Sequence, residues 1–197
     1  MQHTSSRAQV RKLVVAAMLT AILWLIATTP YFGFTLPFFG VGMTFVHIPM
    51  IIGLLTEGLW VGTFLSGAFG FSSLFNAISR PTSIYAPMFQ NPLVSVLPRL
   101  LIGPALYGVS LIAQRLLHGR RRAQVAVVSV SGALLNTLFT LSAMTAMQLI
   151  NPGITGASSG VTIAGIWALA ANAPFECASA LIVCTALMAA LDKLYHK

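Results

Sequence analysis

Six apolar segments, separated by polar or turn-rich stretches, limit what this chain can fold into. They cover about residues 13–28, 44–55, 59–78, 92–116, 125–150 and 161–191, and the second is the shortest. A helix that spans a bilayer needs roughly 20 mostly apolar residues. Only 7% of the 197 residues are charged, whereas a typical soluble domain has about a quarter. We therefore expect an all-α integral membrane protein, a six-transmembrane-helix bundle that forms a single membrane-embedded domain over residues 1–197.

The basic residues are distributed unevenly among the loops of this six-span arrangement. Nine of the eleven lysines and arginines fall on one face: Arg7, Arg11, Lys12, Arg115, Arg120, Arg121, Arg122, Lys193 and Lys197. Only Arg80 and Arg99 fall toward the other face. Because loops rich in Lys and Arg are retained in the cytoplasm, we expect both termini to be cytoplasmic. The net charge of +8 is then explained by topology, and we expect no nucleic-acid partner.

The loops on the two faces also differ in length and composition. Residues 56–58 and 118–124 form short connections on the basic face, whereas 29–43, 79–91 and 151–160 are long, turn-rich loops on the other. Proline and glycine clusters stop helices and build ordered turns, and long ordered loops commonly carry binding function. We expect these outer loops to cap a ligand pocket. The alternative is that they are ordinary connecting loops.

Polar residues gather where the third and fourth apolar segments meet the loop between them, and one more opens the second segment. They are Asn76, Arg80, Tyr85, Gln90, Asn91 and Arg99, with His47. Arg99 is expected roughly 10 Å inside its span, at 1.5 Å per residue, and a charge inside a span is by default a functional hypothesis. Two guanidiniums, from Arg80 and Arg99, would suit a carboxylate ligand. The alternatives are a salt bridge between Arg99 and Glu176 and a solvated Arg80.

Three further polar residues fall within the last two apolar segments: Asn136, Asn172 and Glu176. Asn172 precedes Glu176 by four residues, so we expect both on one helix face, with a kink at Pro174 between them. Polar groups in hydrocarbon need partners. They either bond the helices to one another or line the deep end of a pocket. His47 likewise either contacts a ligand or bonds to a loop.

Other motifs narrow the functional classes. The sequence has no GxxxxGK[ST] loop, no HExxH and no Cys/His metal set, so we expect neither a metal nor a cofactor in this chain. Glu57 and Asp192 fall at helix ends, which leaves Glu176 as the sole candidate acid or base and gives little support for an enzyme. Ala17 and Ala21 form a small-xxx-small pair that lets another helix approach closely.

Several stretches resemble the substrate-binding S components of energy-coupling factor (ECF) vitamin transporters. VHIPMIIG opens the second segment, GTFLSGAFGFSSLFNA lies in the third, and PTSIYAPMFQNP precedes VSVLPRLLIG. GALLNT in the fifth segment and NAPFE in the sixth continue the match. The turn TEGLW departs from the family, where a more basic, GPK-like stretch is expected.

This resemblance implies a vitamin-binding protein of the prokaryotic plasma membrane. An S component binds its vitamin on the outer side and docks on a transmembrane coupling subunit with two ATPase subunits, which use the ATP. Ala17 and Ala21 would form the docking surface, and the S component would topple in the membrane to deliver its ligand.

The stretches are most similar to the pantothenate-type branch. Arg80 or Arg99 would then hold the carboxylate, and the hydroxyl and amide groups would meet a set of amide side chains: Asn76, Gln90, Asn91 or Asn172. Cobalamin, then folate or riboflavin, are the alternative vitamins. From other classes, the alternatives are a membrane-embedded enzyme that uses Glu176 and His47, and a structural subunit without a ligand.

Overall fold

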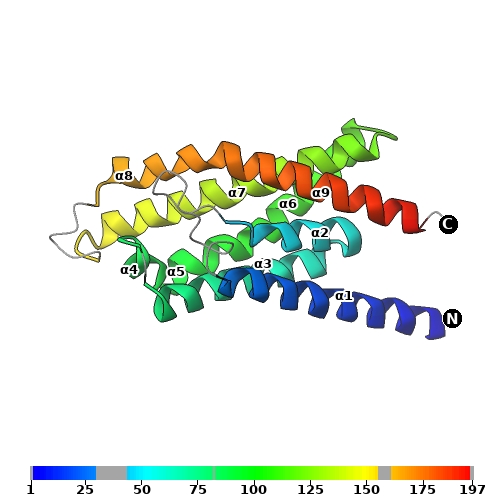
Figure 1. The fold of residues 1–197 in the computed structure, drawn as a ribbon, viewed down its shortest axis with the longest axis horizontal. Helices are drawn as coiled ribbons and strands as arrows, with labels where there is room; N and C mark the ends of the chain where they lie inside the picture. Colours follow the sequence, from blue (N-terminus) through cyan, green and yellow to red (C-terminus); the bar gives the residue numbers. More distant parts are fainter. Residues whose placement is uncertain (1, 30–43, 82, 155–160, 196–197) are drawn as a thin grey trace.

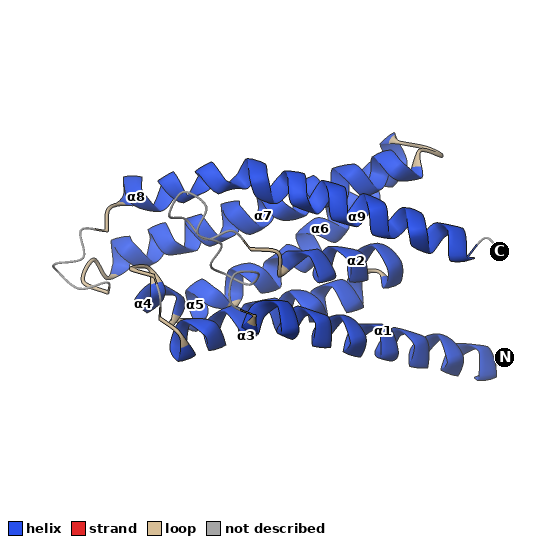
Figure 2. Ribbon diagram, viewed as in Figure 1, coloured by secondary structure: helices blue, strands red, loops and turns tan. Residues whose placement is uncertain are grey.

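In the computed structural model, five stretches are helical, long and apolar enough to cross a membrane. They are Ser6–Thr28, Leu59–Ser79, Pro92–Leu116, Arg121–Ile150 and Ile163–Lys193. The structure describes residues 2–29, 44–81, 83–154 and 161–195, and within these ranges it has helices and turns but no strands (Figure 2). The expected all-helical fold is confirmed, and five of the six expected segments overlap these spans. Four of them have nearly the same bounds, whereas 13–28 shares only its end with Ser6–Thr28.

The chain order is a series of long helices joined by short ones (Figure 1). The long helices are α1 (Gln2–Thr28), α3 (Leu59–Ser79), α6 (Leu97–Leu116), α7 (Arg121–Ile150) and α9 (Ala173–Tyr195). The short ones are α2 (His47–Glu57), α4 (Ala86–Phe89), α5 (Pro92–Ser95) and α8 (Ile163–Ala168), with the 3-10 turn η1 (Leu169–Asn172). The start of α1 and the end of α9 lie at one end of the bundle, and α4, α5 and α8 lie at the other.

The second expected span differs most from expectation. Helix α2 has 11 residues, which gives a length of about 16 Å at 1.5 Å per residue, whereas the hydrocarbon core of a bilayer is about 30 Å thick. Every residue from His47 to Leu54 is buried, so α2 lies inside the bundle and not against lipid. The six-span count and the cytoplasmic termini therefore stay predictions.

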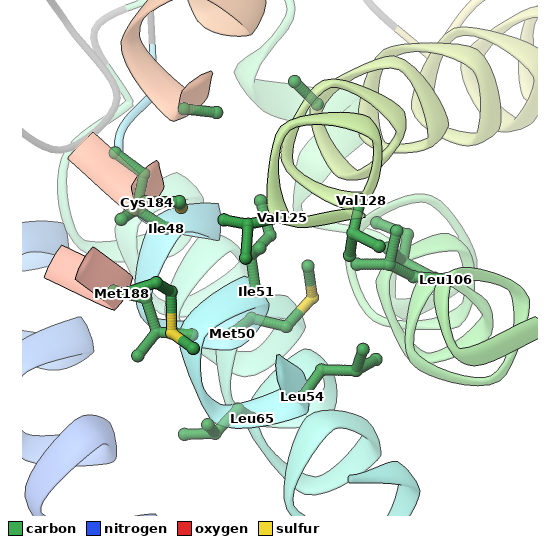
Figure 3. Close-up of a cluster of buried hydrophobic side chains, with 14 of the residues drawn as sticks. Ile48, Met50, Ile51, Leu54, Leu65, Leu106, Val125, Val128, Cys184 and Met188 are labelled. Atoms are coloured by element: carbon green, nitrogen blue, oxygen red, sulfur yellow. The ribbon is translucent and has the colours of Figure 1, made fainter. Parts of the chain in front are cut away.

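Helix α2 forms the centre of the apolar core (Figure 3). Its Met50, Ile51 and Leu54 meet side chains of the surrounding helices: Leu65 of α3, Leu106 of α6, Val125 and Val128 of α7, and Cys184 and Met188 of α9. On the outer surface of the bundle, large apolar side chains such as Leu13, Phe71 and Ile182 are exposed. A helix that is apolar on its outward face suits contact with lipid, so this surface fits a membrane-embedded bundle.

The last apolar segment is interrupted by a 3-10 turn. Helix α8 ends at Ala168, η1 follows, and α9 begins at Ala173. Pro174 cannot donate a backbone hydrogen bond, and its ring disfavours the α-helical geometry of the preceding turn. The interruption therefore agrees with the kink expected at Pro174.

The close approach of α3 and α6 depends on Gly103. A Cβ atom added there would lie 2.7 Å from the Cα of Thr63, a backbone atom that cannot turn away. We expect Gly103→Ala to lower the free energy of unfolding by about 1–3 kcal/mol through overpacking. Gly108→Ala is the matched control on α6, since an added Cβ there meets nothing among the described residues within 4 Å. Thermal unfolding in detergent measures both, and equal stability of the two variants would contradict the close approach.

Candidate ligand-binding site

Five polar side chains are buried where helices α2, α6, α7 and α9 begin or meet. They are His47, Arg99, Asn136, Thr140 and Glu176, which we call the buried polar cluster, and none is more than 7% exposed. His47 is the first residue of α2, Arg99 is the third residue of α6, and Glu176 is in the first turn of α9. Asn136 and Thr140 are four residues apart on α7, so they share a face of that helix.

Glu176 connects the elements of this cluster. Its Oε1 accepts a hydrogen bond of 3.2 Å from the backbone N–H of Thr44, three residues before His47. Its Oε2 accepts one of 3.4 Å from the hydroxyl of Thr137, next to Asn136. The carboxylate therefore joins α9 to α7 and to the chain that enters α2.

The expected alternative of an Arg99–Glu176 salt bridge can be compared with the contacts. The two groups interact electrostatically, but the salt bridges of the described residues are Arg11–Glu57 at 2.9 Å and Arg121–Asp192 at 3.9 Å. Glu57, Asp192 and Glu176 are the three carboxylate side chains of the sequence. Arg99 is thus close to a carboxylate without being paired to it directly.

Arg99 is held by groups on three sides. Its Nη1 donates a 2.7 Å hydrogen bond to the carbonyl oxygen of Val94, and its own carbonyl oxygen accepts one from the hydroxyl of Ser66. The guanidinium carbon lies 5.5 Å from the ring centroid of Phe69 and 5.1 Å from that of Phe89. Its Nε is buried and has no hydrogen-bond partner among the described residues.

Other members of the cluster also have polar atoms without partners. Within the described residues, this holds for the Oδ1 of Asn136 and the Oγ1 of Thr140, and neither ring nitrogen of His47 makes a hydrogen bond of normal geometry, although the Thr44 backbone lies nearby. An unsatisfied buried donor or acceptor costs about 1–3 kcal/mol, so each one needs an explanation. A polar ligand that bonds to these atoms is one such explanation.

The other polar residues at this end of the bundle are engaged mainly with the main chain. The side-chain nitrogens of Asn76, Arg80 and Gln90 donate to the carbonyl oxygens of Ser72, Thr28 and Ala77, respectively. The Tyr85 hydroxyl donates to the Gly165 carbonyl, and Asn91 caps α5 by accepting the N–H of Leu93. The Arg80 contact joins the end of α3 to α1, and those of Gln90 and Tyr85 join the two ends of α4 to α3 and α8. A ligand contact at any of the five stays a prediction.

Asn172 is the last residue of η1, whereas Glu176 belongs to α9. The two residues thus belong to successive helical elements, and the expectation that they share one helix face stays a prediction. Much of the outer loops that we expect to cap the pocket, residues 30–43, 82 and 155–160, lies outside the described residues.

Several residues around the cluster were missed by sequence reasoning. Thr44 and Thr137 bond to Glu176, and Phe69 and Phe89 flank Arg99. Threonine and phenylalanine are common in apolar segments, so the residue type alone does not indicate a site residue. Thr140 is the exception, because its spacing of four from Asn136 on a helix places it on the same face and could have identified it.

Comparison with known proteins gives the family. Residues 11–191 match the family model of the ECF transporter, substrate-specific component. The chain belongs to this family. The resemblance inferred from its sequence motifs is thereby confirmed, and the protein is a membrane-embedded component of a transporter with several apolar helices.

One relative of this substrate-specific component is the pantothenate transporter PanT of Leuconostoc mesenteroides subsp. mesenteroides. The two are 31% identical over 102 residues, which cover 50% of this chain and 50% of the relative. The matched stretch thus spans half the length of that relative.

The unpaired hydroxyl of Thr140 makes a testable prediction about stability. Thr140→Val keeps the shape of the side chain and removes a buried polar group without a partner, so we expect the ligand-free protein to gain about 1 kcal/mol. Thr145→Val, on the same helix, is the matched control and should bring no such gain, because the Thr145 hydroxyl donates a 2.8 Å hydrogen bond to the Leu141 carbonyl. Thermal unfolding without ligand measures both. A loss of stability in Thr140→Val would mean that the hydroxyl is bonded.

Proposed function

We propose that the chain is the high-affinity pantothenate-binding S component of an ECF-type ABC uptake transporter in a prokaryotic plasma membrane. Family membership and the PanT relative support this proposal. The observation that carries it is the buried Nε of Arg99 without a hydrogen-bond partner among the described residues, together with the unpaired polar atoms buried on α2 and α7.

The ligand's chemistry matches this set of side chains. Pantothenate has a carboxylate at one end and an amide and hydroxyl groups along its length. A guanidinium binds a carboxylate through two parallel N–H donors, and Arg99 supplies that fork. The Asn136 amide, the Thr140 hydroxyl and the His47 ring supply donors and acceptors for the amide and hydroxyls. Glu176 adds an acceptor for a ligand hydroxyl.

Of the two arginines considered for the carboxylate, Arg99 fits better. It is 4% exposed, and a charge pair shielded from water is stronger than one at a surface. Arg80 is exposed, and its Nη1 donates a 2.7 Å hydrogen bond to the Thr28 carbonyl at the end of α1. We assign Arg99 to the ligand and Arg80 to the end of α1.

The alternatives receive less support. Cobalamin would leave the Arg99 edge without a carboxylate, and the PanT relative favours pantothenate over folate and riboflavin.

An enzyme that uses Glu176 would need partner groups for acid or base chemistry. The only ring nitrogens offered by the cluster are those of His47, and the described residues hold no group of three or more His, Cys, Asp and Glu placed to bind a metal. Glu176→Gln would abolish turnover in such an enzyme.

The proposed partners are a transmembrane coupling subunit and two ATPase subunits. Ala17 and Ala21 are both exposed on α1, and they share a face with the exposed Val14, Met18 and Leu25. Small residues flanked by larger apolar ones let a second helix approach closely in the bilayer. We assign this face to the coupling subunit, and we place the arginine-rich turn between α6 and α7 in the cytoplasm.

Replacing Arg99 tests the binding site. We expect Arg99→Gln to weaken pantothenate binding at least about 30-fold, the loss typical when one partner of a buried charge pair is removed. Arg80→Gln is the matched control and should bind nearly as wild type. Equilibrium binding to the purified protein in nanodiscs measures both, with thermal unfolding as a check on folding. Wild-type affinity in folded Arg99→Gln would refute the assignment.

Replacing the two alanines of α1 tests docking. We expect Ala17→Trp combined with Ala21→Trp to retain pantothenate binding but to abolish uptake into proteoliposomes that also contain the coupling and ATPase subunits. Bulky rings prevent the close approach of a partner helix. Ala146→Trp, at an exposed alanine of α7, is the control. Uptake at the wild-type rate in the double variant would remove the docking assignment.

A further inference from the structure

We propose that Phe69 and Phe89 set the preference of this site for an anionic ligand, because they hold the Arg99 guanidinium away from Glu176 and ready for an external carboxylate. The inference rests on the proposed function, since it concerns the residue assigned to the pantothenate carboxylate. It adds two positioning residues that carry no charge and make no hydrogen bond through their side chains.

The two rings come from different elements and meet at the same cation. Phe69 lies on α3 and is fully buried, and Phe89 ends α4 and is half-buried. The Arg99 guanidinium carbon is 5.5 Å and 5.1 Å from their centroids. Both distances are within the range of about 6 Å at which a ring face attracts a cation. The guanidinium is therefore flanked by two aromatic rings.

The remaining contacts of Arg99 decide which of its edges is available. Nη1 is occupied by the Val94 carbonyl at 2.7 Å. The backbone of Arg99 is fixed by Ser66, whose hydroxyl donates to the Arg99 carbonyl and accepts the Gly103 N–H at 3.1 Å. Nε is buried without a partner among the described residues. The Nε edge of the guanidinium is thus the one with an unpaired donor for a carboxylate.

Glu176 is the competitor for that edge. It interacts electrostatically with Arg99 but forms no salt bridge with it in the described part of the chain. A buried arginine without other restraints gains by turning to a carboxylate nearby, since unlike charges attract strongly where water is excluded. The rings and the Val94 carbonyl oppose that rotation. Without one ring, Arg99 could pair with Glu176, and an external carboxylate would have to displace it.

This arrangement predicts a selective effect on ligands that differ only in charge. Pantothenate and pantothenol share the same hydroxyls and amide, but pantothenol has an alcohol in place of the carboxylate. A pre-organised cation lowers the ordering cost for the anionic ligand alone. Removing a ring should therefore weaken pantothenate binding and leave pantothenol binding nearly unchanged.

The experiment compares the two dissociation constants for the purified full chain in nanodiscs. Phe89→Leu keeps an apolar side chain and removes the ring face, and we expect the ratio of pantothenol Kd to pantothenate Kd to fall by roughly three- to tenfold. Phe89→Tyr restores the ring and should recover the ratio. Phe139→Leu is the matched control, at a half-buried phenylalanine of α7 that packs on the core. Phe69→Leu gives a second variant if Phe89→Leu does not fold.

The outcomes separate this inference from the proposed function. A reduced ratio in Phe89→Leu, with wild-type ratios in Phe89→Tyr and Phe139→Leu, supports the inference. If Phe89→Leu and Phe69→Leu both fold and both keep the wild-type ratio, the inference is overturned and the proposed function is left intact. Equal weakening of both ligands in the ring variants also overturns it, because the rings would then only support the fold. Wild-type protein that binds neither ligand overturns the proposed function together with the inference.

Discussion

The arrangement of this bundle depends on one guanidinium kept inside an apolar protein. A buried charge is expensive unless other groups compensate for it. Arg99 is compensated by the Val94 carbonyl, by the faces of Phe69 and Phe89, and by the field of Glu176. These groups come from α3, α4, α5 and α9. Four elements therefore pack around the start of α6, where they compensate one buried cation.

The short helix α2 makes room for this arrangement. Its 11 residues are too few to cross a bilayer, and its first residue, His47, is fully buried inside the protein. The apolar part of α2 fills the centre of the bundle (Figure 3), and its polar beginning meets α7 and α9 through Thr44 and Glu176. Helix α2 therefore passes from the buried polar cluster at its first residue into the apolar core.

Much of the fold follows from the sequence, because long apolar runs in a chain with few charges have few alternatives. The predicted segment 92–116 has the bounds found in the structure, and 59–78 differs from Leu59–Ser79 by one residue. The length of α2 could not be predicted, since an apolar run of that size is equally consistent with a lipid-exposed span and a buried core helix. A kink at Pro174 was predicted, but the 3-10 turn Leu169–Asn172 just before it was not.

The candidate site was predicted less completely. Charged and amide residues stand out in an apolar sequence, so His47, Arg99, Asn136 and Glu176 could be named. The difference between Arg80, which bonds to the end of α1, and Arg99, which is buried, depends on how α1 packs against α3. The positions of Phe69 and Phe89 beside Arg99 depend on the tertiary fold as well, and nothing in an aromatic residue's local sequence distinguishes it from a lipid-facing one.

The most direct test of the account is equilibrium binding of pantothenate, cobalamin, folate and riboflavin to the purified chain in nanodiscs, without coupling or ATPase subunits. We expect tight, saturable binding of pantothenate and much weaker binding of the other three. Tight binding of cobalamin, folate or riboflavin instead, or no binding of pantothenate by folded protein, would contradict it.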